Sequence, residues 1–211
     1  PWLLPYVSVR SRTFEPDLRD ATSRRSDYPQ LFANFAAPAD LPHPAARLLM
    51  TELAIFDLDG TLLDTIGDLA VACNAALALR GLPQHSYEEY CGFVGNGILR
   101  LVERALPEPL RTPHTVAAVR RDFVEYYTAH IDLRTRPYEG IPELLRTLAA
   151  RGVRLAVASN KFQAGTSKLV ARFFPDVEFA AVLGQREGVA LKPDPAVAEE
   201  ILQRVPVPRD R

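Results

Sequence analysis

The sequence predicts an α/β protein: a parallel sheet with an all-helical segment inserted after its first strand. The apolar run Leu53–Phe56 stops at an aspartate, which is typical of a short buried parallel strand with polar groups at its carboxyl end. A second apolar run, Val153–Ala158, stops in the same way at Ser159. Between the two runs, residues 66–136 have the 3.6-residue periodicity of amphipathic helices.

The first strand is followed by Asp57-Leu58-Asp59-Gly60-Thr61. Ligands bind at the carboxyl edge of open α/β sheets, and a turn at Gly60 can aim both carboxylates at one substrate. One carboxylate can attack phosphorus and form an acyl phosphate, while the other moves the proton. Two carboxylates beside an anionic substrate call for a divalent cation, and hard oxygen ligands favour Mg²⁺. A bare Asp-x-Asp is also typical of a strand ending in an Asp-capped turn, so the longer pattern carries the interpretation.

Capping signals divide the helical segment. Ser86 and Glu89 match a capping box, and Thr112-Pro113 matches an N-cap followed by proline at the first helical position. The loop Gly95-Asn96-Gly97 precedes another amphipathic stretch. Its glycines would let backbone amides approach an anion at a helix N-terminus, although Gly-Asn-Gly is also an ordinary turn.

The second strand ends in Ser159-Asn160, whose hydroxyl and amide can hydrogen-bond a phosphoryl oxygen without adding charge. A helix over 163–173 and a third strand over 179–183 are expected next. Lys192 then precedes Asp194 and Pro195, which we expect to cap and open a helix. A Ser-Asn turn or a lone lysine is common on its own, so the succession of these groups carries the prediction of a phosphate site.

The string Phe56 to Asp64 resembles the first motif of the haloacid dehalogenase-like hydrolase superfamily. Ser159-Asn160 resembles its second motif, and Lys192-Pro193-Asp194-Pro195 its third. The resemblance implies a Rossmann-like core, with Asp57 as nucleophile and Asp59 as general acid/base. It also implies that Lys192 pairs with the nucleophile and the phosphate. By the same resemblance, phosphate is bound by Thr61, Ser159 and Asn160, and Mg²⁺ by Asp57 and the Asp59 carbonyl.

The stretch from Val94 to Leu106 is similar to the cap loop of phosphoglycolate phosphatases in that superfamily. This resemblance implies that residues 66–136 form a helical cap over a core of residues 50–65 and 137–211, with Gly95, Asn96 and Gly97 near the phosphate. It implies Mg²⁺-dependent hydrolysis of a small phosphomonoester, 2-phosphoglycolate above others, through an aspartyl phosphate. A β-phosphoglucomutase-like or broad sugar phosphatase is the alternative enzyme, and an inactive truncated fragment is the alternative of another class.

Composition is that of an ordinary soluble globular protein, with 47% hydrophobic residues, 24% charged residues and a net charge of −1. This balance favours neither nucleic acid nor a membrane as partner, so a small phosphorylated metabolite is expected. Cys73 and Cys91 form no metal-binding pattern, and we expect a reducing, cytoplasmic location.

Residues 1–49 contain seven prolines and no sustained helical or strand period, so we expect an irregular extension outside the fold. Met50 is the only methionine, and our hypothesis is that it is the natural start. A flexible functional extension is the competing interpretation.

The superfamily's fourth motif, a Gly-Asp pair with a further Asp at the end of the next strand, has no match between Lys192 and Arg211. Without that strand, Leu53–Phe56 would be left at an unpaired sheet edge, which is an aggregation liability. We therefore expect the 211-residue chain to fold poorly and to have little activity, and the intact gene product to be the active phosphatase.

Overall fold

The computed structural model describes residues 51–207. The expected extension over 1–49 and the hypothesis about Met50 lie outside these residues. The described elements are, in order, β1 (Leu53–Phe56), β2 (Leu63–Asp64), α2 (Ile66–Ala78), α3 (Tyr87–Phe93), α4 (Gly97–Ala105), η3 (Glu108–Leu110), α5 (Pro113–Ala129), β3 (Arg136–Pro137), α6 (Ile141–Ala150), β4 (Arg154–Phe162), α7 (Gln163–Phe173), β5 (Phe179–Gln185) and α8 (Ala196–Arg204).

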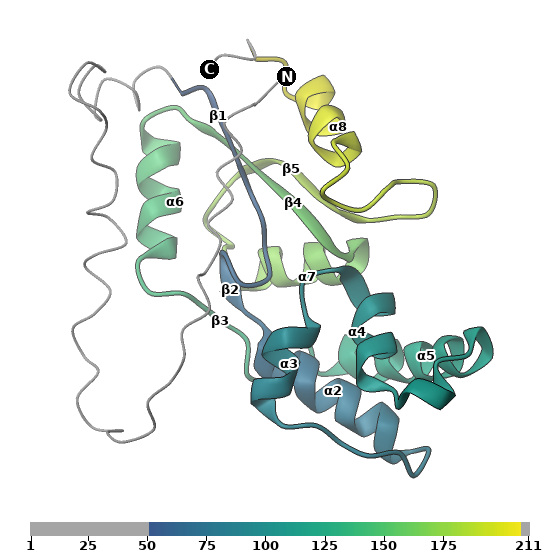
Figure 1. Cartoon of the computed structure of the whole chain (residues 1–211). Coiled ribbons are helices and arrows are strands. Elements are labelled where there is room, and N and C mark those ends of the chain that lie inside the picture. Colours follow the sequence, from purple (N-terminus) through teal and green to yellow (C-terminus); the bar gives the residue numbers. More distant parts are fainter. Residues whose placement is uncertain (1–50, 208–211) are drawn as a thin grey trace, which may run out of the picture. The chain divides into compact units, whose positions relative to one another are not determined.

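Strands β1, β4 and β5 form a parallel sheet in the order β1-β4-β5, which confirms the predicted fold class (Figure 1). The register aligns Phe56, the last residue of β1, with Val157 of β4. The chain that leaves β1 therefore emerges beside the part of β4 that follows Val157. Within residues 51–207, β1 pairs only with β4, in agreement with the expected unpaired edge.

The two faces of β4 bury different side chains, as the two-residue period of a strand requires. Leu155 and Val157 belong to the larger hydrophobic cluster, which includes residues of α6 and α7. Ala156 and Ala158 belong to a smaller cluster with residues of α8. The strand is thus covered on both faces, which suits a central parallel strand.

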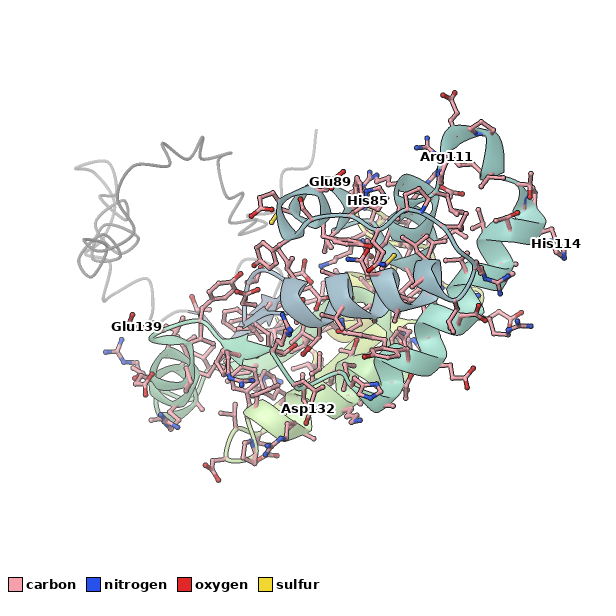
Figure 2. All side chains as sticks on the ribbon, turned by 90° about the horizontal axis from the view of Figure 1, so that it is seen from below. His85, Glu89, Arg111, His114, Asp132 and Glu139 are labelled. Carbon is pink, nitrogen blue, oxygen red and sulfur yellow. The ribbon has the colours of Figure 1, made fainter. Side chains whose placement is uncertain are left out.

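Helices α2 to α5 lie together beyond the carboxyl ends of β1 and β4 (Figure 1). The predicted capping box is present: the Ser86 hydroxyl accepts from the amide of Glu89, and the Glu89 carboxylate accepts from the amide of Ser86. Thr112 caps α5 as predicted. His85, beside Glu89 in Figure 2, also contacts the Ala105 carbonyl through Nε2 at 2.7 Å and so joins α3 to the end of α4.

Three element boundaries differ from the sequence prediction. Strand β4 continues past Ala158 to Phe162, because the chain regains its pairing with β5 after an irregularity. The third strand extends to Gln185. Helix α8 begins at Ala196, with Pro195 in the N-cap position, and Asp194 accepts from the Ala196 amide at 2.9 Å.

The helices within residues 51–207 include none that is both long enough and apolar enough to cross a membrane.

Asp68, on the first turn of α2, is a buried carboxylate that joins the two ends of the helical segment. It accepts hydrogen bonds from the amides of Arg134 and Thr135 and from the Thr135 hydroxyl, at 2.8 to 3.0 Å. Only 4% of the residue is exposed. A buried donor that loses its acceptor destabilises the fold. The Asp68 carboxylate therefore holds residues 134–135, which lead into β3, against α2.

We expect Asp68→Ala to lower the free energy of unfolding by about 3 kcal/mol, because it removes the carboxylate that accepts from the amides of Arg134 and Thr135 and from the Thr135 hydroxyl. Urea denaturation of the protein expressed from its complete gene measures this loss. The exposed Glu125, on α5, provides the control: Glu125→Ala is expected to change stability by less than about 0.5 kcal/mol. Equal stabilities for the two variants would contradict a clamping role for Asp68.

Candidate active site

The chain turns sharply where β1 ends. The amides of Leu62 and Leu63 both donate to the carbonyl of Leu58, at 3.0 Å each. Gly60 has a backbone φ of +77°, a conformation that costs glycine nothing but strains residues with a Cβ. The turn places Asp57 and Asp59 on one cavity.

Asp57 is the more accessible of the two carboxylates. Its side chain is 42% exposed, and its Oδ2 lies 2.9 Å from the Nζ atom of Lys192. Its Oδ1 accepts from the amide of Leu58 at 2.7 Å. The carboxylate is therefore oriented by a cation and an amide while it remains open to a ligand.

Lys192 reaches Asp57 from the loop before α8. Its Nζ also donates to the carbonyl of Ala158, at 2.7 Å. Asn160 holds the lysine backbone from both sides: Oδ1 accepts from the Lys192 amide at 2.8 Å, and Nδ2 donates to its carbonyl at 3.1 Å. Both polar atoms of Asn160 thus position Lys192. The sequence predicted instead that the Asn160 side chain binds the phosphate.

Asp59 faces a second lysine, Lys161, near the end of β4. Lys161 Nζ lies 3.0 and 3.2 Å from the two Asp59 carboxylate oxygens and 4.8 Å from the ring centroid of Tyr127, within the range of a cation–π interaction. Burial opposes the charged ammonium, but Asp59 and Tyr127 outweigh it and raise the pKa of Lys161. Lys161 is therefore a cation at neutral pH.

The helical segment supplies part of the lining of the cavity. Gly95 and Gly97 line it from the loop before α4, and Tyr127 lines it from α5. The Tyr127 hydroxyl is buried without a hydrogen-bond partner in the described part of the chain. Burial raises the pKa of this hydroxyl to about 12.

Most of the predicted site residues meet at this cavity. The residues that line it are Asp57, Asp59, Ser159, Asn160, Gly95 and Gly97, and Lys192 bonds to Asp57. The Ser159 hydroxyl oxygen accepts from the Lys161 amide at 3.2 Å, which leaves its O–H free to donate to a ligand.

Two predicted residues lie elsewhere. Thr61, in the turn after Gly60, is not among the residues that line the cavity. Asn96 is exposed, and its side-chain oxygen accepts from Arg104 at 2.8 Å. The loop therefore brings its two glycines, and not the asparagine side chain, to the site.

Lys161 and Tyr127 are site residues that the sequence reasoning missed. The sequence predicts that the second strand ends at Ala158, and no role is predicted for Lys161. A signal did exist: Lys161 is one of only three lysines in the chain and lies two residues after Ser159, the spacing that repeats a strand face. Tyr127 offered no such signal, since its place at the cavity depends on how α5 packs.

The oxygen donors of the site fit Mg²⁺. Residues 51–207 contain no group of three or more acidic, histidine or cysteine side chains arranged to hold a metal. Mg²⁺, however, is usually held by one or two protein carboxylates together with water and substrate phosphate. The Asp57 carboxylate and the Asp59 backbone carbonyl supply donors of this kind.

Comparison with known proteins gives a consistent result. A phosphoglycolate phosphatase from Cereibacter sphaeroides is 36% identical over 144 residues, which cover 67% of this chain and 66% of that protein. The crystal structure of a predicted phosphoglycolate phosphatase from Haemophilus somnus superposes with a TM-score of 0.68 at 31% identity, and the match covers 74% of this chain and 72% of that one. CbbY from Rhodobacter sphaeroides, crystallised with phosphate, superposes with a TM-score of 0.63 at 25% identity, over 75% of this chain and 74% of that one.

The chain thus spans just under two thirds of the Cereibacter relative. The family model of haloacid dehalogenase-like hydrolases matches residues 54–211. This range begins within β1 and contains every group that forms the cavity. The chain therefore belongs to the haloacid dehalogenase-like hydrolase family.

Proposed function

We propose that the protein is a Mg²⁺-dependent phosphatase that hydrolyses a small phosphomonoester through an aspartyl phosphate on Asp57. The observation that carries this proposal is the pairing of each carboxylate at the end of β1 with its own lysine, Asp57 with Lys192 and Asp59 with Lys161. The two carboxylates thereby occupy different environments, with the Asp57 side chain 42% exposed and that of Asp59 17% exposed, and such pairs take different roles in catalysis.

In the first step, an Asp57 oxygen attacks phosphorus. The bond between phosphorus and the ester oxygen breaks, and its electron pair goes to the departing oxygen. Asp59, in its protonated form, gives that oxygen a proton, so the alcohol leaves neutral. Asp57 is the suitable nucleophile because it is the accessible carboxylate of the pair.

In the second step, water attacks the same phosphorus. Asp59, now ionised, takes a proton from the water, and the bond between phosphorus and Asp57 breaks. Inorganic phosphate leaves and both aspartates return to their starting states. Splitting the hydrolysis in this way replaces one difficult step with two easier ones.

The negative charge of the phosphate and of Asp57 is balanced by cationic and hydrogen-bond-donating groups around the cavity. Lys192 lies against Asp57, where its ammonium can also meet a phosphoryl oxygen. The free O–H of Ser159 and the backbone around Gly95 and Gly97 provide donors without charge. Mg²⁺, held by Asp57 and the Asp59 carbonyl, would neutralise charge on the phosphate.

Residues 66–136 act, in this proposal, as a cap that closes over a core of residues 50–65 and 137–211. Its residues Tyr127, Gly95 and Gly97 line the same cavity as the carboxylates. Closure would exclude bulk water and select the substrate by size.

For the substrate we propose 2-phosphoglycolate. The relatives described as phosphoglycolate phosphatases support this choice. A cytoplasmic location is proposed with it, because Cys73 and Cys91 are both free thiols, as is usual in a reducing compartment.

Asp57→Asn is expected to lower turnover of phosphomonoesters by about 10³-fold or more, since the amide is not a nucleophile. Removal of Mg²⁺ with EDTA is expected to stop turnover, and added MgCl₂ to restore it. Release of inorganic phosphate by the protein from the complete gene measures both effects. Asp176→Asn, in an exposed turn, is the matched control and should keep full activity. Turnover that survives Asp57→Asn would contradict the proposal.

The substrate assignment has its own test. We expect kcat/KM for 2-phosphoglycolate to exceed that for glucose 1-phosphate and glucose 6-phosphate by about 10-fold or more, a difference of roughly 1.4 kcal/mol in transition-state binding. A steady-state comparison on one enzyme preparation decides it. Preference for a hexose phosphate would favour the sugar phosphatase or β-phosphoglucomutase-like alternative.

A further inference from the structure

Lys161 takes part in neither chemical step of the mechanism above, yet it is the most deeply buried charge at the site. Its side chain is 2% exposed, compared with 12% for Lys192. Its ammonium reaches both carboxylate oxygens of Asp59, at 3.0 and 3.2 Å. A buried charge is costly unless it is paired. The partner of Lys161 is Asp59, the carboxylate that transfers the proton in the proposed mechanism.

The surroundings of Lys161 hold it in place. Its amide donates to the Ser159 hydroxyl oxygen at 3.2 Å, and its carbonyl accepts from the Thr166 hydroxyl at 3.1 Å. Its ammonium lies over the ring of Tyr127, 4.8 Å from the centroid. Backbone, strand and aromatic ring therefore fix the ammonium before any substrate arrives.

We propose that Lys161 is the positioning residue for Asp59, orienting its carboxyl group toward the leaving oxygen of the substrate. An ammonium that contacts both oxygens sets the plane of the carboxyl group. A carboxylate offers about four lone-pair sites, so the two contacts leave sites on each oxygen for the proton that is transferred. Small displacements of a catalytic group lower the rate strongly. Lys161 would therefore affect the rate by fixing the position of the Asp59 carboxyl group. This inference rests on the proposed function, in which Asp59 is the general acid.

A purely structural role for the Lys161–Asp59 pair makes a different prediction. If the pair only stabilised the fold, its loss would lower the rates for all substrates by the same factor. If Lys161 positions the acid, its loss matters only where the leaving group needs a proton. An alkoxide needs one, whereas p-nitrophenolate is stable enough to leave without it.

The experiment compares kcat/KM for 2-phosphoglycolate and for p-nitrophenyl phosphate, because kcat/KM reports the step in which the ester bond breaks. For Lys161→Met in the protein from the complete gene, we expect a loss of about 10²-fold or more with 2-phosphoglycolate, the usual contribution of general acid catalysis. With p-nitrophenyl phosphate the loss should be only a few-fold. Asp59→Asn is expected to show the same selective loss.

Lys168→Met is the matched control. This lysine is exposed on α7 and donates to the Thr128 carbonyl at 2.9 Å, so both rates should stay unchanged. Both rates of a variant come from one preparation, so their ratio does not depend on the fraction that is folded. Lys161→Gln, a smaller change in polarity, gives the same ratio test if the methionine variant does not fold.

The outcomes separate the inference from the proposed function. Equal losses with both substrates, or no loss, in an otherwise active enzyme would overturn the role of Lys161 and leave the phosphatase standing. A wild-type protein that hydrolyses neither ester would overturn both. A selective loss with 2-phosphoglycolate, matched by Asp59→Asn and absent in Lys168→Met, supports the inference.

Discussion

The parallel pairing of β1 with β4 is the constraint on which the site depends. Its register sets Phe56 beside Val157, so the chain that leaves β1 runs next to the last residues of β4. The carboxylates of Asp57 and Asp59 can therefore meet lysines that are distant in sequence. A slip of one residue would turn every β1 side chain to the other face and carry the aspartates away from their partners.

The motif residues could be predicted from the sequence because strand ends and glycine turns are local signals. Asp57, Asp59 and Ser159 were predicted in this way, and all three line the cavity. The exact end of β4 could not be predicted, since it depends on pairing with β5 after an irregularity. No role was predicted for Lys161, which lies in this continuation of the strand. Tyr127 and the contacts of Asn160 with Lys192 likewise depend on tertiary packing, which periodicity does not specify.

Some polar side chains of the site position other residues, and others remain available to a ligand. Both polar atoms of Asn160 hydrogen-bond to the backbone of Lys192. The ammonium of Lys161 forms an ion pair with Asp59. Asp57 and the Ser159 hydroxyl keep capacity for a ligand. A preorganised site requires residues that orient the reacting groups. Without them, a mobile charged side chain would have to be ordered during each turnover. In our account the two lysines therefore differ in function although each pairs with one aspartate.

The central claim is that a phosphoryl group passes through Asp57. Rapid acid quenching of the protein from the complete gene during turnover, followed by proteolysis and mass spectrometry, tests it most directly. We expect a phosphorylated peptide whose modified residue is Asp57, present only while substrate remains. Steady hydrolysis with no phosphorylated peptide, or with the phosphoryl group on another residue, would contradict it.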